Sequence, residues 1–136
     1  MANDADAVVA RARALIGVRF RPQGRSAERG LDCLGVVMNA TEIARDRVPE
    51  DYRLRDGDVR RMNAGFARLG FSPLPADKAE PGDIVVANSG PGQLHAVLLT
   101  PGGYIHAHAG LGRVVETPGA PPWPVHAAWR PSRNGG

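Results

Sequence analysis

The one cysteine of the chain, Cys33, stands where a turn-rich segment gives way to an apolar run. Asp32, directly before it, is a favoured helix N-cap residue. The apolar residues that follow have helical spacing: Val36, Val37, Ala40, Ile43 and Ala44. A thiol in the first turn of a helix faces partial positive charge and free backbone N–H groups, and both lower its pKa. The segment therefore predicts a cysteine nucleophile. The plain alternative is a small buried apolar side chain.

Cysteine catalysis needs a base beside the thiol, and the chain offers four histidines: His95, His106, His108 and His126. The pattern predicts a strand over 94–99, a tight turn and a second strand over 104–108, so His95 has a histidine of the next strand as a neighbour. Side chains alternate along a strand, so His106 and His108 share one face. Either can pair with His95, depending on register. A Cys-His-His site forms if the Cys33 helix packs its N-terminus against this sheet.

Zinc binding is a rival interpretation of the same histidines. His106 and His108, together with His95 or His126, supply nitrogen ligands of the type that zinc takes. No acidic residue lies nearby at a recognisable ligand spacing, so the sequence argues against a metal site. We expect His126 to be an ordinary strand or loop residue.

Composition narrows the class of protein. A chain of 136 residues predicts one domain over 1–131 with a flexible tail over 132–136. A single cysteine excludes an internal disulfide framework and a Cys-rich zinc site. The net charge is +3, but the arginines are scattered among acidic residues, which argues against a nucleic-acid partner. No run matches a membrane span, and the acidic N-terminus lacks a secretory signal, so we expect no membrane partner and synthesis in the cytoplasm without a signal peptide.

Helical patterns come first along the chain and strand patterns second, which predicts an α+β fold. The expected helices cover 4–17, 33 to 45 or 47, and 59–70, each with one apolar face. In the first helix that face comprises Val8, Ala12, Leu15 and Ile16. The expected strands cover 83–87, 94–99, 104–108, 113–116 and 125–130. Residues 18–30 are expected to be a loop, 88–93 a turn, and 49–57 and 118–124 connectors.

The stretch Leu31-Asp32-Cys33-Leu34-Gly35-Val36-Val37 resembles the Asp-Cys-x-Gly-Leu/Val signature of NlpC/P60 cell-wall peptidases. Further similarity follows in family order over 13–20, 81–85, 95–99, 104–107 and 128–131, so that the resemblance covers about 11–131. It implies the papain-like NlpC/P60 fold, with N-terminal helices packed on a C-terminal antiparallel sheet.

The resemblance also implies a function. It makes Cys33 the nucleophile, His95 the general base and acid, and His106 the residue that orients His95. The implied reaction is hydrolysis of amide bonds in the stem peptides of peptidoglycan, without a cofactor. Asp32 matches a position that contacts the free amine of the stem peptide in some members, and it is as readily explained as the helix cap.

Two positions near the thiol depart from the family pattern. Phe20 stands where the family often has a tyrosine, whose hydroxyl lies near the thiol, and Gln23 is a candidate replacement for that polar group. Leu34 replaces a frequent serine. Two alternatives stay open. One is the same fold acting on another amide or acyl substrate, such as a delivered toxin would have. The other, which Phe20 and Leu34 favour slightly, is a catalytically silent structural or wall-binding module of a phage-tail-like assembly.

Small members of this kind without a leader resemble peptidases encoded with phage tails or gene transfer agents. The resemblance implies tail proteins as possible partners and an association with a virion or tail, or delivery to the cell wall.

Overall fold

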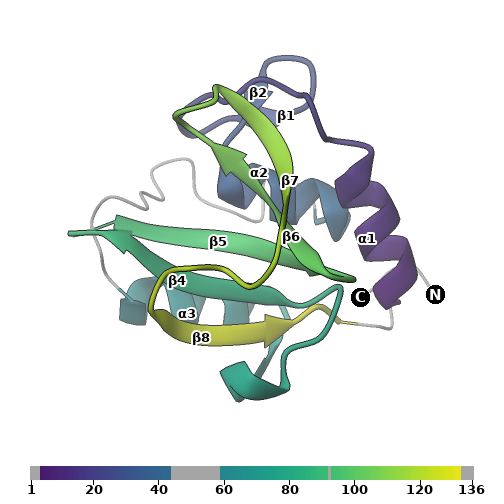
Figure 1. Ribbon diagram of the computed structural model, residues 1–136. Coiled ribbons are helices and arrows are strands. Elements are labelled where there is room, and N and C mark those ends of the chain that lie inside the picture. Colours follow the sequence, from purple (N-terminus) through teal and green to yellow (C-terminus); the bar gives the residue numbers. More distant parts are fainter. Residues whose placement is uncertain (1–3, 44–58, 92, 133–136) are drawn as a thin grey trace.

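The computed structural model describes residues 4–43, 59–91 and 93–132 and has the expected α+β architecture (Figure 1). Its helices are α1 (Ala5–Arg13), α2 (Cys33–Ala40), α3 (Val59–Arg68) and the 3₁₀ turn η3 (Ala76–Lys78). Its strands are β1 (Arg25–Ser26), β2 (Gly30–Leu31), β3 (Ser72–Leu74), β4 (Ile84–Gly90), β5 (Gln93–Thr100), β6 (Gly103–His108), β7 (Arg113–Pro118) and β8 (Val125–Arg130). Strands β3 to β8 form one antiparallel sheet in the order β3-β8-β4-β5-β6-β7.

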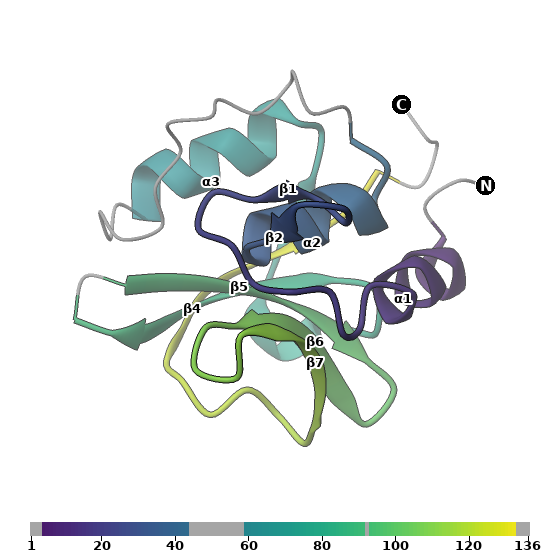
Figure 2. The same ribbon diagram turned by 90° about the horizontal axis from the view of Figure 1, so that it is seen from above.

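The two faces of this sheet carry different cores. Figure 2 shows α2 and α3 on one side of it, and a large apolar cluster joins the three α-helices to the inward-facing residues of the sheet. The opposite face carries a smaller cluster, made of Val85, Val97, Tyr104 and Ala128 with Trp123 packed against it. Because strand residues alternate between faces, successive residues of β5 contribute to both clusters.

Helix α1 starts as expected and ends early. The Asp4 carboxylate accepts the Ala7 N–H at 2.8 Å, so it is the N-cap. The helix ends at Arg13, and residues 14–17 turn instead, closing on Gly17 in a left-handed conformation. The prediction that Ile16 lies on the buried face is wrong, because this turn leaves its side chain 44% exposed.

Helix α2 begins at Cys33, as predicted, but the predicted end at 45 or 47 is wrong. Thr41 is already the C-cap, and its hydroxyl donates to the Val37 carbonyl oxygen at 2.7 Å. Glu42 follows with a φ of 57°, a left-handed conformation that cannot continue a right-handed helix. The apolar pattern that extended the helix to Ile43 thus reflects packing of that side chain against the core beyond the helix end. The predicted connector over 49–57 lies outside the described residues.

The segment 18–30, expected to be a loop, contains the hairpin formed by β1 and β2. This hairpin packs directly on the first turn of α2. A Cβ added at Gly35 would overlap the carbonyl oxygen of Gly24, and one added at Gly24 would overlap the carbonyl oxygen of Gly30. Glycine at these positions therefore lets three backbone segments approach more closely than any side chain would allow, and it holds the hairpin against the start of α2.

Two strand limits also differ from expectation. The predicted turn over 88–93 is shorter, because β4 continues to Gly90 and β5 begins at Gln93. Strand β3 was missed, since its central Pro73 cannot donate a backbone hydrogen bond and proline usually argues against a strand. Pro73 is tolerated because β3 is the edge strand and pairs with β8 alone.

Substituting Gly35→Ala should lower the free energy of unfolding by about 1–3 kcal/mol, because the new methyl group meets a backbone oxygen that cannot move without displacing the hairpin. Urea unfolding followed by circular dichroism measures the loss. Gly90→Ala is the matched control, because its new Cβ meets only the end of the Gln93 side chain at 3.2 Å. Equal effects of the two substitutions would contradict the close packing at Gly35.

Candidate active site

The sulfur of Cys33 lies between the first turn of α2 and strand β5. The side chain is 2% exposed, and the Ala96 backbone N–H donates to Sγ at 3.5 Å. Ala96 directly follows His95 on β5, so the sulfur lies beside the backbone of the residue next to the predicted base. No hydrogen bond joins Sγ to an imidazole within the described part of the chain.

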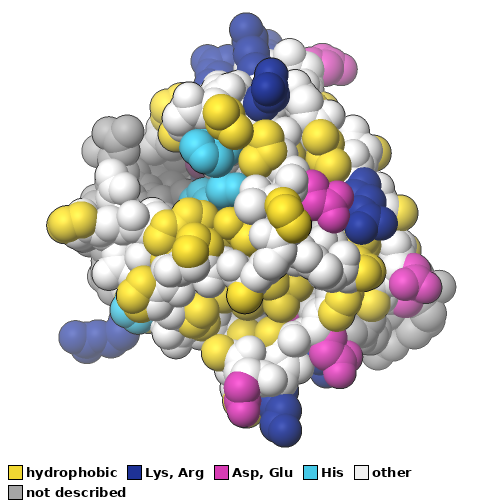
Figure 3. Space-filling model, in the orientation of Figure 1, with side chains coloured by type: hydrophobic (Ala, Val, Ile, Leu, Met, Phe, Trp, Pro, Cys, Tyr) yellow, Lys and Arg dark blue, Asp and Glu magenta, His cyan; other side chains and the backbone are white. Residues whose placement is uncertain are grey.

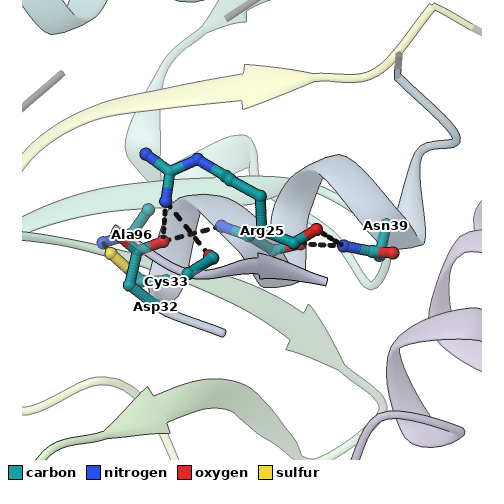
Figure 4. Close-up of polar contacts among 7 residues, drawn as sticks. Arg25, Asp32, Cys33, Asn39 and Ala96 are labelled. Carbon is teal, nitrogen blue, oxygen red and sulfur yellow. Dashed lines mark hydrogen bonds and ion pairs between the residues drawn. The ribbon is translucent and has the colours of Figure 1, made fainter. Parts of the chain in front are cut away.

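Asp32 holds the start of α2 with its carboxylate. Its Oδ1 accepts the Gly35 N–H at 2.9 Å and, at 2.6 Å, a hydrogen bond from Nη1 of Arg25 (Figure 4). Both side chains of this ion pair are only 8% exposed. The capping role predicted for Asp32 is confirmed, and Arg25 already balances its charge.

The two imidazoles of His95 and His106 are in contact. His95 Nε2 lies 2.7 Å from His106 Nδ1, and the rings meet edge to face. His106 Nε2 lies 3.5 Å from the hydroxyl of Thr117 on β7. The ring of His108 is beside that of His106, but its Nδ1 accepts the Leu111 N–H at 3.0 Å and so is held in the next turn. The choice between His106 and His108 as the partner of His95 is therefore settled by geometry in favour of His106.

These contacts allow two arrangements of protons. If His106 Nε2 donates to Thr117, then His106 Nδ1 is an acceptor and His95 must carry its proton on Nε2. The Nδ1 atom of His95 then keeps its lone pair and can accept a proton. In the reverse chain of donors, His95 would carry its proton on Nδ1 and could not act as a base through that atom.

Aromatic side chains surround the histidine pair. Trp123, from the connector between β7 and β8, packs edge-on against His95 with ring centres 5.2 Å apart, and it also contacts His106 and Tyr104. Figure 3 shows histidine side chains at the edge of a hollow in this face, next to hydrophobic side chains. Sequence reasoning missed Trp123, Thr117 and Arg25, because none belongs to a local motif; only the composition of the proline-rich connector, with a tryptophan in it, marked Trp123 as unusual.

Burial sets the protonation of the site. It raises the pKa of Cys33 to about 12, with the Asp32 charge adding to the effect and the Ala96 N–H and Arg25 opposing it. The expected lowering of the thiol pKa is therefore wrong for this conformation, because burial outweighs the backbone hydrogen bonds and the Arg25 charge that lower the pKa. Burial also lowers the pKa of His95 to about 4, assisted by His108, and that of His106 to about 4, assisted by His95 and His108. At neutral pH the site consists of a thiol and neutral imidazoles.

The fold has close counterparts among solved structures. The P60 domain of an antigen from Mycobacterium avium subspecies paratuberculosis is 21% identical with a TM-score of 0.61, over 93% of this chain and 92% of that one. The peptidoglycan hydrolase RipB from Mycobacterium tuberculosis is 22% identical with a TM-score of 0.60, over 93% of this chain and 63% of RipB. The chain has the NlpC/P60 fold.

A third counterpart is RipD from Mycobacterium tuberculosis, described as a non-catalytic NlpC/P60 domain protein adapted to peptidoglycan binding. It is 17% identical with a TM-score of 0.56, over 93% of this chain and 95% of RipD. The NlpC/P60 fold therefore occurs with and without catalysis. No protein-family model and no curated protein matches the sequence.

Phe20, which stands where the family often has a tyrosine, and Gln23, its candidate replacement, have different surroundings. Phe20 is partly buried against the main core, and its N–H donates to the Gly112 carbonyl oxygen at 2.8 Å. Gln23 is exposed in the turn before β1, with a φ of 59°. Phe20 thus has a packing role, and substrate contact by either residue stays a prediction.

The rival metal interpretation finds no support in the described residues, where no group of three or more His, Cys, Asp or Glu side chains could hold an ion. The helices in the described ranges include none long and apolar enough to cross a membrane. His126, expected to be an ordinary strand residue, lies exposed on β8.

The low histidine pKa values predict acid sensitivity. Between pH 6.5 and about 4 the unfolded chain binds protons that native His95 and His106 do not, so the free energy of unfolding falls as the pH falls through this window. One independent histidine with this shift contributes roughly 3 kcal/mol by the low-pH end. Urea unfolding at several pH values measures the slope.

The double variant His95→Gln/His106→Gln should flatten this slope, whereas His126→Gln, which removes an exposed histidine, should leave it in place. If the double variant keeps the wild-type slope, burial of the histidine pair is not the cause of the acid sensitivity.

Proposed function

We propose that this protein is a cysteine peptidase that hydrolyses amide bonds in the stem peptides of peptidoglycan. The proposal rests on the 2.7 Å contact of His95, on β5, with His106, on β6, next to the Ala96 amide of β5 that donates to the sulfur of Cys33. The NlpC/P60 fold adds support, since RipB, which has it, is a peptidoglycan hydrolase.

In the proposed reaction the Cys33 thiol leaves the Ala96 amide, passes its proton to Nδ1 of His95, and attacks the carbonyl carbon of the substrate. Burial keeps His95 neutral at pH 7, so its Nδ1 has a lone pair that can accept the proton, and the negative thiolate then stabilises the imidazolium. Backbone N–H groups at the start of α2 stabilise the oxyanion. His95 then protonates the leaving amine and afterwards activates the water that hydrolyses the thioester.

His106 acts in this scheme by holding the His95 ring. Its Nδ1 accepts the Nε2 proton of His95, which fixes the tautomer with a free Nδ1. Trp123 covers the pair from one side and excludes water from it. The chemistry requires no metal or organic cofactor, because nucleophile, base and oxyanion donors all come from the chain.

The test is mass spectrometry of muropeptides incubated with the purified protein. We expect new stem fragments with wild-type protein and none with Cys33→Ala. His95→Ala should lower kcat between about 100-fold and 10,000-fold, the range for loss of a general base. His106→Asn should retain more activity than His106→Ala, because an amide still offers a hydrogen-bond partner to His95.

His126→Gln is the matched control and should cleave like the wild type, since this histidine is exposed on β8. Cleavage that survives Cys33→Ala would contradict the proposed nucleophile. An inactive wild-type protein would contradict the reaction itself.

A second candidate function is binding of peptidoglycan without cleavage. The burial of Cys33, its pKa of about 12 and the lack of a described hydrogen bond to His95 favour it, and RipD provides a precedent for such use of the fold. If this alternative holds, wild type and Cys33→Ala should sediment equally with insoluble peptidoglycan, and neither should release fragments.

Delivery to the wall is the part of the proposal that rests on sequence resemblance alone. The similarity to small peptidases of phage tails and gene transfer agents leads us to propose tail proteins as partners. Tail or capsid genes beside the gene for this chain would support that role, and isolation of the chain from purified tail particles would test it directly.

A further inference from the structure

Arg25 carries a buried hydrogen-bond donor that nothing in the described structure uses. The Arg25 side chain is only 8% exposed. Its Nη1 donates to Asp32 Oδ1 at 2.6 Å and to the Gly24 carbonyl oxygen at 3.1 Å, whereas Nη2 is buried and has no hydrogen-bond partner. A guanidinium group stays charged at every physiological pH, so this end of it keeps both charge and directed N–H groups. Buried donors are normally satisfied, and an exception needs an explanation.

The guanidinium is held in place beside the thiol. The Arg25 carbonyl oxygen accepts from Asn39 Nδ2 at 3.1 Å, and the same Nδ2 donates to the Gly35 carbonyl oxygen at 2.8 Å. Arg25 is therefore tied to α2 through both its backbone and its Nη1. Figure 4 shows the guanidinium of Arg25 at the start of α2, where Asp32 and Cys33 lie. The influence of Arg25 on the pKa of Cys33 agrees with this proximity.

We propose that Arg25 Nη2 binds a carboxylate of the substrate next to the amide bond that Cys33 attacks. The bound group is an anion because the donor is charged, and a carboxylate because a planar N–H donor suits a planar acceptor. Asp32 remains engaged with the helix and with Nη1, so Nη2 is the end of the arginine left to donate, and a bound carboxylate becomes buried against it. This inference rests on the proposed function for the identity of the substrate: a stem peptide whose glutamate α-carboxylate is free and not amidated.

The proposal contrasts with the amine contact that the resemblance assigns to Asp32. A free carboxylate at that position would attract an ammonium group, but here the carboxylate is buried and paired with Arg25. The unsatisfied group of the pair is the cation. We therefore expect the part of the site next to Arg25 to bind negatively charged groups.

A first experiment tests the anion preference without any substrate. Iodoacetate and iodoacetamide have nearly the same size, and both alkylate a thiol with loss of iodide, but only iodoacetate carries a carboxylate. Since Cys33 is the one cysteine, the mass gained by the chain reports its reaction alone. The rate ratio of iodoacetate to iodoacetamide should be at least tenfold higher in the folded protein than in the urea-unfolded chain. A conformational opening that exposes Cys33 raises the rate with both reagents by the same factor, so it cancels in the ratio of the two rates.

The variant Arg25→Gln/Asp32→Asn should bring the folded ratio down to that of the unfolded chain. Removing both partners avoids an unpaired buried carboxylate, asparagine still caps the helix, and the net charge is unchanged. Asp32→Asn alone keeps the cation and should keep the high ratio. A folded wild-type ratio equal to the unfolded one, or a double variant that retains the wild-type ratio, would overturn the proposal.

A second experiment applies if the folded chain excludes both reagents. Calorimetry with Cys33→Ala compares the peptide L-Ala-γ-D-Glu-diaminopimelate with the same peptide amidated at the glutamate α-carboxylate. We expect Cys33→Ala to bind the carboxylate form at least tenfold more tightly than the amidated form. The triple variant Arg25→Gln/Asp32→Asn/Cys33→Ala should bind the two peptides equally. Equal binding of the two peptides would refute carboxylate recognition.

The outcomes separate this inference from the proposed function. A peptidase that cleaves both stem forms equally and shows no alkylation preference keeps its function and loses the carboxylate site. A protein that prefers iodoacetate but cleaves nothing keeps the anion site and loses the proposed function.

Discussion

The carboxylate of Asp32 satisfies the backbone at the start of α2, and the rest of the site depends on that contact. Helix α2 is buried along almost its whole length, so the free N–H groups of its first turn cannot rely on water. Asp32 supplies the acceptor for Gly35 and draws Arg25 to the same oxygen. The glycines of the adjoining hairpin allow the backbones to touch there. Together, these contacts between the hairpin and the start of α2 hold Cys33 against β5 with little freedom to move.

Sequence patterns predicted where the helices begin better than where they end. Asp4 and Asp32 mark two helix starts because capping is a local interaction between neighbouring residues. The end of α2 depends instead on Glu42 adopting a left-handed conformation, which a glutamate in the sequence does not predict. In the same way, β3 is a strand only because β8 lies beside it, and that pairing joins residues more than fifty positions apart.

The site residues also separate into those that local sequence patterns predict and those that depend on long-range packing. Alternation along predicted strands brought His95, His106 and His108 to one face, and the structure confirms this placement. Extending the β5–β6 ladder, which pairs Leu98 with Ile105, would set His108 opposite His95, so counting residues selects the wrong partner. The contact with His106 is diagonal, and the turn holds His108 away. Arg25 and Trp123 reach the site from segments without a motif, and the buried state of the thiol follows from packing that no local pattern encodes.

The position of β8 has a consequence for how the protein is made. This strand is the last in the chain order, yet it lies between β3 and β4 and is the only described partner of β3. The connector that leads into it carries Trp123 across the face with the histidines. During translation, a ribosome-bound chain that has not yet released β8 has an open sheet and an uncovered histidine pair. The complete site thus forms only after β8 has left the exit tunnel.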